Sequence, residues 1–410
     1  MNLKRHYQSS FKKPSKWPVI FLIGGFVGIT AIAFGLFYKA FTSAVRVDIA
    51  SQPTLQSGAN GPVIPQQADL GHSYGIAAGG SLPGKSDEDI DAYMASVADS
   101  GAKWVRFDFN WALIQPDAAD AYNWERTDAI VEAAQRHGLY VLGIIDYTPG
   151  WARSSVCPES DKCEPAKSKQ FATFARAVSH RYKEKGLHYW EIWNEPNNPQ
   201  FWQPRSNPQR YAELLKDASK ELRAEDKDAY IITAGLSPQA TTENSYAPAD
   251  FLRAVYGAGV KDSFDAVADH PYTFPITPKN QVEHAWNQMA SLSYGLRQIM
   301  VNNGDAGKKI WITEFGSPTG GPGAISTIEN PNLDAHPYVV DEALQAKILS
   351  DAADLYASYE WAGPFMYYSY QDSGTTQDTN ENFFGLVRFD GSKKPAYQTF
   401  KDAATSSATK

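Results

Sequence analysis

From residue 71 onward, short apolar runs alternate with longer amphipathic stretches. The apolar runs have the length and the β-branched and aromatic content of buried strands. The stretches between them place apolar residues at helical spacing, and one of them begins with Ser86, a suitable N-cap. The predicted strands cover residues 74–78, 104–111, 140–147, 189–195, 230–237, 266–272, 309–316 and 364–372. The clearest predicted helices cover residues 86–102, 124–138, 168–186, 207–226 and 341–361.

Strand-then-helix units repeated along one chain predict an α/β fold, a (β/α)8 TIM barrel over residues 71–402. An open doubly wound sheet is the alternative, but no glycine-rich turn follows the first predicted strand. In a (β/α)8 barrel the C-terminal ends of the strands surround the functional site. Candidate functional residues are therefore expected at those ends.

The first 70 residues lack this alternation. Residues 19–38 carry no charge, and as a helix they would span about 30 Å, the thickness of a bilayer's hydrocarbon core. Residues 1–18 hold five basic and no acidic side chains, which predicts a cytoplasmic N-terminus and places the rest of the chain outside. We expect a transmembrane signal anchor at 19–38. A cleaved signal peptide, which has a shorter apolar core, is the alternative.

The predicted organisation follows from these boundaries. A basic cytoplasmic tail (1–18) and the anchor precede a flexible linker at 39–70, which is rich in Gln, Ser, Pro and Gly and lacks periodicity. The barrel at 71–402 follows, and residues 403–410 form a short C-terminal tail. We expect the catalytic domain to be monomeric and the chain to contact the membrane through residues 19–38.

Composition narrows the classes of partner. The chain has 410 residues and a formal charge of −8, and the basic tail leaves −13 for the remainder. Because nucleic-acid binding depends on neutralising phosphates, a nucleic-acid partner is disfavoured. Only two cysteines occur, Cys157 and Cys163, and outside the cytoplasm such a pair is expected to form a disulfide. A zinc site is disfavoured because no histidine lies near them.

Two predicted strands end in a glutamate within a short motif. Glu195 lies in Trp-Asn-Glu-Pro-Asn at the end of the fourth strand, and Glu314 lies in Trp-Ile-Thr-Glu-Phe-Gly at the end of the seventh. Two carboxyl groups on facing strand ends can cleave a glycosidic bond, one as general acid and the other as nucleophile or as base on a water. Either glutamate alone could be an ion-pair partner, but together they predict a catalytic pair.

Other strand ends carry polar residues on faces that would otherwise be core. Arg106, Asp108 and Asn110 share one face of the second predicted strand, and His270 and Tyr272 share one face of the sixth. A single histidine or arginine is more often structural. Polar groups at the same rim on four strands favour a site.

With these residues in place, the chain resembles the retaining (β/α)8 glycoside hydrolases of clan A, which include families five and thirty-nine. The resemblance covers about residues 71–402, including a tail motif at 384–397. Asn194 and Glu195 are similar to the clan's Asn-Glu pair, which implies Glu195 as acid/base and Asn194 as a contact to the sugar 2-hydroxyl. Glu314 resembles the nucleophile.

The same resemblance implies further substrate-site residues. Arg106 would position the nucleophile, and His270-Pro271-Tyr272 is similar to the clan's His-x-Tyr, with Tyr272 donating to the nucleophile. The last strand departs from the pattern, because many members have a tryptophan there and this chain has none. Tyr368 or Tyr370 is expected to take its place.

Trp151 and Trp202 follow the third and fourth predicted strands, in loops at the active rim. They could stack on sugar rings or simply pack under the loops, and the sequence leaves both alternatives open.

Together these observations predict a membrane-anchored retaining glycoside hydrolase that cleaves O-glycosidic bonds of an extracellular or cell-envelope polysaccharide. Within the clan the chain looks most like bacterial endoglycosidases that act on exopolysaccharide or cell-envelope glycan. The alternatives are a non-catalytic glycan-binding envelope protein and a transglycosylase using the same carboxyl pair. No cofactor and no metal are predicted, because the histidines lack ligand spacing and residues 378–382 lack the glycine of a calcium loop.

Overall fold

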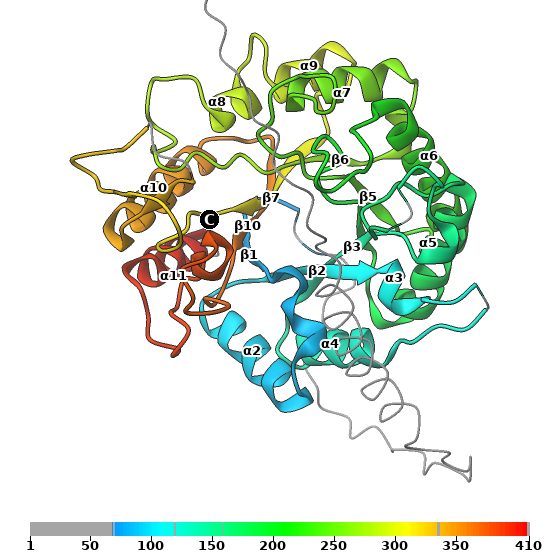
Figure 1. Cartoon of the computed structure of the whole chain (residues 1–410), viewed down its shortest axis with the longest axis horizontal. Helices are drawn as coiled ribbons and strands as arrows, with labels where there is room; N and C mark the ends of the chain where they lie inside the picture. The colour runs from blue at the N-terminus through cyan, green and yellow to red at the C-terminus, as the bar shows by residue number, and fades with distance from the viewer. Residues whose placement is uncertain (1–67, 69, 119, 158, 334–336, 408–410) are drawn as a thin grey trace, which may run out of the picture. The chain divides into compact units, whose positions relative to one another are not determined.

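The computed structural model describes residues 68, 70–118, 120–157, 159–333 and 337–407. Its eight long strands are parallel and close into a barrel, in which β10 pairs with both β7 and β1 (Figure 1). They are β1 (Tyr74–Ala77), β2 (Trp104–Asn110), β3 (Tyr140–Asp146), β4 (Tyr189–Ile192), β5 (Tyr230–Thr233), β6 (Ala266–Asp269), β7 (Lys309–Phe315) and β10 (Ala362–Tyr368). This closed parallel barrel confirms the predicted (β/α)8 fold.

The strand ends differ from the prediction where the candidate site begins. Strand β4 ends at Ile192 and β6 at Asp269, so Glu195 and Tyr272 lie in the loops that follow these strands rather than on them. Trp193 and Glu195 have φ angles of 71° and 45°, in the left-handed region, which is incompatible with a strand. The loop positions bring both side chains above the barrel opening.

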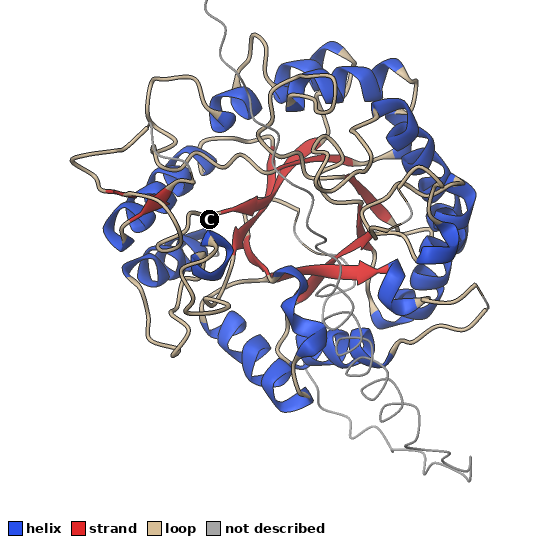
Figure 2. Ribbon diagram, in the orientation of Figure 1, coloured by secondary structure: helices blue, strands red, loops and turns tan. Residues whose placement is uncertain are grey.

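Helices cover the outside of the barrel (Figure 2). Several begin at side chains that accept from the backbone N–H three residues on, as Ser86, Asn207 and Asp341 do. The predicted helices correspond to α2 (Asp87–Asp99), α4 (Glu125–Arg136), α5 (Ser168–Tyr182), α6 (Pro208–Glu225) and α10 (Glu342–Tyr356). The others are α3 (Trp111–Ile114), α7 (Pro248–Gly257), α8 (Ala285–Ala290), α9 (Leu296–Asn302) and α11 (Pro395–Ser407), which continues into the predicted tail.

Aromatic side chains close the barrel interior below the strand ends. The rings of Trp104 and Trp311 meet edge to face at 5.2 Å, and Trp104 meets Tyr189 at 4.9 Å. All three are buried. Because successive inward positions on a strand are two residues apart, the layer above them contains Arg106 on β2 and Glu191 on β4. The polar residues of the strands therefore stand on an apolar floor.

Two features lie outside the barrel pattern. A short parallel pair, β8 (Ile325–Ser326) and β9 (Val339–Val340), follows β7 and was not predicted, because two-residue strands leave no periodic signal. None of the described helices is long and apolar enough to cross a membrane. The predicted anchor at 19–38 and nearly all of the predicted linker lie outside the described residues.

The predicted disulfide between Cys157 and Cys163 is present. It crosslinks the loop between β3 and α5. That loop also pairs with the segment after Glu195, because Gln203 N–H donates to the Lys162 carbonyl at 2.9 Å and Glu164 N–H donates to the Gln203 carbonyl at 3.1 Å. The crosslinked loop thus braces the segment that leads away from Glu195.

Candidate active site

A cavity of about 380 Å³ opens at the C-terminal ends of the strands. Six of the residues predicted from sequence line it: Arg106, Asn194, Glu195, Tyr272, Glu314 and Tyr368. They come from β2, β7, β10 and the loops after β4 and β6, so the fold gathers residues that are more than 250 positions apart in the chain. The predicted clustering at one rim is therefore observed.

Glu314 enters the cavity because β7 departs from regular alternation. Ile312 pairs with Phe365 of β10, whereas Phe315 pairs with Tyr367, so β7 contains one extra residue at this point. Such a bulge lets two successive side chains face the interior. Phe315 packs outward against Trp286 and Phe365. Glu314 is thereby directed at the cavity.

Two donors hold the Glu314 carboxylate. Arg106 Nη1 donates to Oε1 at 2.5 Å, and the Tyr272 hydroxyl donates to Oε2 at 2.8 Å. Burial favours the neutral acid, but the charges of His270 and Arg106 and the hydrogen bond from Tyr272 outweigh it and lower the pKa of Glu314 below its ordinary value. Glu314 is therefore suited to remain ionised.

Glu195 is placed by a strained turn and by a glycine opposite it. Its N–H donates to the Gly235 carbonyl at 3.1 Å, and Asn198 Nδ2 approaches its Oε2 at 3.4 Å. A Cβ at position 235 would lie 2.0 Å from His270 Nε2, so only glycine lets the chain pass this close to the imidazole ring. The left-handed φ of Glu195 is the kind of backbone strain that is found at functional sites.

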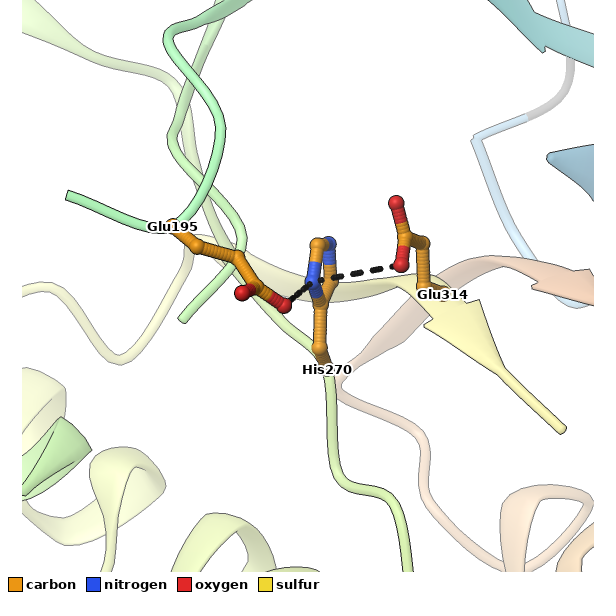
Figure 3. A group of neighbouring side chains, drawn as sticks. All are labelled: Glu195, His270 and Glu314. Carbon is orange, nitrogen blue, oxygen red and sulfur yellow. Dashed lines mark hydrogen bonds and ion pairs between the residues drawn. The ribbon is translucent and has the colours of Figure 1, made fainter. Parts of the chain in front are cut away.

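His270 lies between the two carboxyl groups (Figure 3). Its Nδ1 is 2.9 Å from Glu195 Oε1 and 3.6 Å from Glu314 Oε2. The ring is fully buried. Burial opposes its charged form, but the Glu314 charge and the hydrogen bond with Glu195 outweigh this opposition and raise the pKa of His270. The histidine thus links the two glutamates electrostatically.

Glu191 is the most important residue that sequence reasoning missed. It is fully buried and binds Arg106 through both carboxylate oxygens, at 2.7 Å to Nε and 3.0 Å to Nη2. It also accepts from the Gly235 N–H at 2.8 Å and from the Thr313 hydroxyl at 3.2 Å. A signal was present, since an acid in the middle of an apolar strand needs a buried partner.

The other N–H groups of Arg106 donate to residues of the cavity lining. Nη2 donates to the Asn194 side-chain oxygen at 3.0 Å, in addition to Glu191, and Nη1 donates to Glu314. One guanidinium therefore fixes the orientation of three side chains from β4, the loop after it, and β7. This geometry agrees with the positioning role that the resemblance implied for Arg106.

Three predicted aromatic contacts do not line the cavity. Trp202 is 1 % exposed and packs edge to face against Trp193, so the packing alternative holds for it. Tyr370 is 8 % exposed and packs against Tyr93. Trp151 is half-buried and donates from Nε1 to the Gln115 carbonyl at 3.1 Å. A position near the rim does not determine which side of its loop a side chain faces. Of the two tyrosines offered in place of the tryptophan, Tyr368 rather than Tyr370 lines the cavity, and sugar stacking by Trp151 stays a prediction.

Other residues complete the cavity lining. Phe201, adjacent to Trp202, faces it, as do Asp108, Asn198 and Glu381. Asp108 belongs to the polar face recognised on the second strand. Glu381 lies in the loop after β10, in the 3₁₀ helix Asn380–Phe383, and accepts from the Tyr368 hydroxyl at 3.3 Å. Nothing in its local sequence indicated that it faces the site.

Glu195, His270 and Glu314 also form the kind of group that could hold a metal ion. One ligand atom from each lies within 4.8 Å of the others. The guanidinium of Arg106, which already binds Glu314, opposes a second positive charge there. The hydrogen bonds of these residues account for their arrangement, and the predicted lack of a metal stays a prediction.

Comparison with known proteins places this arrangement in a family. The family model described as cellulase (glycosyl hydrolase family 5) matches residues 72–349. The chain belongs to glycosyl hydrolase family 5. This membership confirms the resemblance to clan A that the motifs around Glu195 and Glu314 indicated. No curated protein sequence gave a significant match to this family 5 chain.

Solved structures share the fold of this family 5 chain at low identity. A family 39 glycoside hydrolase from Bacteroides cellulosilyticus WH2 superposes with a TM-score of 0.60 at 24 % identity, over 80 % of this chain and 63 % of that chain. The GH5_18 protein from Streptomyces cattleya, solved with Manb1-4GlcNAc, gives 0.60 at 14 % identity, over 82 % of both chains. A monomeric beta-xylosidase from Caulobacter crescentus CB15 gives 0.57 at 18 % identity, over 80 % of this chain and 67 % of that chain.

Replacing Glu191 by Gln should lower the activity, although Glu191 does not line the cavity. The change leaves Arg106 buried without its bidentate anion, so we expect kcat/KM to fall by about 100-fold through misplacement of Glu314. The free energy of unfolding should fall by about 3 kcal/mol, as expected when one partner of a buried ion pair is removed. Activity is measured well below the unfolding temperature, with the exposed Glu360→Gln as the matched control. A Glu191→Gln enzyme with near wild-type kcat/KM would contradict this role.

Replacing Tyr272 by Phe should change the pH dependence in one direction. The tyrosine hydroxyl helps to lower the pKa of Glu314, so its loss should raise that pKa. Because Glu314 must be ionised to act as the expected nucleophile, the acid limb of the kcat/KM profile should move to higher pH. Tyr246→Phe, which removes a hydroxyl outside the cavity lining, should leave the limb in place. A limb that stays fixed or moves to lower pH in Tyr272→Phe would refute the assignment.

Proposed function

We propose that this protein is a retaining glycoside hydrolase that cleaves O-glycosidic bonds of a polysaccharide by double displacement. The observation that carries the proposal is the proximity of the two glutamates, since one carboxylate oxygen of Glu195 lies within 4.8 Å of one of Glu314. Retaining enzymes hold the two carboxyl groups about 5–5.5 Å apart, whereas inverting enzymes need about 6.5–9.5 Å to admit a water. The spacing therefore supports Glu314 as nucleophile and Glu195 as acid/base.

In the first step, ionised Glu314 attacks the anomeric carbon and Glu195 gives its proton to the departing glycosidic oxygen. A covalent glycosyl ester forms at Glu314 while the C–O bond to the leaving sugar breaks. Arg106 and Tyr272 support this step because they keep Glu314 ionised and fix its orientation. In the second step, Glu195 removes a proton from water, which attacks the anomeric carbon and releases Glu314.

Asn194 is suited to hold the sugar during both steps. Its side-chain oxygen accepts from Arg106, which leaves the amide NH2 group for a hydroxyl of the substrate in the cavity. Such a contact to the sugar 2-hydroxyl strengthens in the transition state. A non-catalytic glycan-binding protein would not need this arrangement, and a transglycosylase would use it with a sugar in place of the water.

We further propose that the catalytic domain lies on the extracytoplasmic side of the membrane, where a transmembrane helix at residues 19–38 tethers it. The apolar segment and the basic residues before it support this topology. The Cys157–Cys163 disulfide is consistent with this topology, because disulfides persist in oxidising compartments outside the cytoplasm. An extracytoplasmic site would meet exopolysaccharide or cell-envelope glycan.

Alanine variants of the two glutamates should respond differently to added anions. A substrate must be found first, and because similar structures carry the names beta-xylosidase, exo-beta-1,4-mannosidase and glucosidase, the search for one begins with aryl β-xylosides, β-mannosides and β-glucosides. Each alanine variant should lose at least about 1,000-fold in kcat/KM on oligosaccharides. With azide, Glu195→Ala should give a glycosyl azide of retained configuration and Glu314→Ala one of inverted configuration. Labelling by a 2-fluoro glycoside at a residue other than Glu314, or inverted wild-type products, would overturn the proposal.

The anchor predicts that the full-length protein fractionates with membranes and keeps residues 1–40. Protease added to intact cells should remove the domain that begins near residue 71, because the linker is outside. Mass spectrometry of the purified protein would identify its N-terminus. A soluble protein beginning near Val45 would show that the segment is a cleaved signal peptide instead.

A further inference from the structure

Two carboxylates in the cavity have no part in the mechanism above. Asp108 is near the C-terminal end of β2, and Glu381 is in the loop after β10. Within the described residues, Asp108 makes neither a hydrogen bond nor an ion pair through its side chain. Glu381 has the Tyr368 hydroxyl as its side-chain partner and no ion pair. Neither negative charge is neutralised by a bonded cation, so each is available to a ligand.

Both carboxylates are at junctions between cavities. Asp108 lines the catalytic cavity and also a neighbouring one of about 410 Å³. Glu381 and Tyr368 line the catalytic cavity and a third one of about 420 Å³. Gly80 lines all three, and a Cβ there would meet only Asp108 Oδ2, at 3.8 Å. A sugar chain that extends from the catalytic cavity into either neighbouring cavity would pass one of these carboxylates.

Among the described residues, no basic side chain forms an ion pair with Asp108 or Glu381, although Lys85 lines the third cavity together with Asp89 and Asp372. Arg106, the basic residue in the catalytic cavity lining, is already bonded to Glu191 and Glu314. Arg126 of the second cavity pairs with Asp87 at 2.8 Å, and Lys162, which lies over the Tyr147 ring, pairs with Asp161 at 3.0 Å.

Burial makes both carboxyl groups harder to ionise. Burial raises the pKa of Asp108 to about 6, although Arg106 opposes the shift. Burial, with the nearby Glu314, also raises the pKa of Glu381. A raised carboxyl pKa means that the charged form lacks full compensation, so a nearby ammonium group would stabilise the two carboxylates and a further anion would destabilise them.

We propose that Asp108 and Glu381 select the charge of the sugar units that flank the catalytic cavity, favouring units with an ammonium group and rejecting units with a carboxylate. The inference rests on the proposed glycosidase function and adds the substrate class, a neutral or amino-sugar glycan rather than a uronate-rich one. An ammonium group supplies the missing counter-charge, a hydroxyl or amide donates a hydrogen bond, and a carboxylate does neither.

The test compares probes of similar shape and different charge. Three β-1,4-gluco-hexasaccharides that carry an amine, a carboxamide or a carboxylate at C6 are used as competitive inhibitors of aryl glycoside hydrolysis. The inhibition constant should rise in that order, with at least about a tenfold gap between the carboxamide and the carboxylate, because the cavity only partly screens like charges. Added salt should narrow the gap.

Variants assign the effect to these two residues. Asp108→Asn and Glu381→Gln should each reduce the carboxamide-to-carboxylate gap by several-fold, and the double variant should nearly remove it. The matched controls are Asp117→Asn and Asp378→Asn, which change the net charge equally but lie outside all three cavity linings. The controls should leave the gap unchanged.

The inference fails if the three probes inhibit the wild type equally, if none inhibits, or if the control variants narrow the gap as much as the cavity variants do. These outcomes are distinct from failure of the proposed function. If the proposed function is wrong, no aryl glycoside is hydrolysed and no 2-fluoro glycoside labels Glu314, and both results are obtained before any charged probe is added.

Discussion

The buried ion pair between Arg106 and Glu191 is the constraint on which the site depends. A guanidinium that is 2 % exposed would be very costly to bury alone, and Glu191, which is fully buried, supplies the opposing charge with two hydrogen bonds. The remaining donors of Arg106 are then free to hold Glu314 and Asn194. Because these groups come from β2, β4 and β7, the pair sets the relative position of strands that are distant in sequence. The barrel places these strands side by side, and the ion pair fixes the orientation of the side chains that Arg106 binds.

A closed series of contacts extends from that pair. Glu191 accepts from Thr313, whose hydroxyl is 3.0 Å from His270 Nε2, and His270 Nδ1 reaches Glu195. The two glutamates are therefore connected through protein groups rather than through solvent. A polar network whose members are all partnered is rigid, and groups that are oriented before substrate arrives need little reorganisation during reaction. The apolar floor of Trp104 and Trp311 below keeps this network on one side of the barrel.

The sequence contained most of the fold because the eight strand patterns are strong and repeat in order. It also indicated Arg106, Glu195 and Glu314, whose types are unusual at strand ends. It did not reveal the bulge in β7, since an extra residue is recognised only against its partner strand. Glu191 was not predicted, because an acid within an apolar strand can be assigned to a buried ion pair only once the strand that carries its partner, Arg106 on β2, is placed opposite it. The sequence could not decide between the alternatives for Trp202, or between Tyr368 and Tyr370, because aromatic residues near a rim can face either the core or the substrate.

The disulfide has a consequence for how the protein is produced. The Cys157–Cys163 loop pairs with the segment after Glu195, and that segment carries Phe201 into the cavity lining. No described hydrogen bond joins either cysteine to Arg106 or Glu191. Material made in a reducing cytoplasm would therefore keep its catalytic centre but present a looser wall to the sugar chain. Such a preparation would hydrolyse small activated glycosides at the normal rate but would bind longer sugar chains less tightly. Low activity on a polysaccharide would then be a property of the expression host rather than of the enzyme.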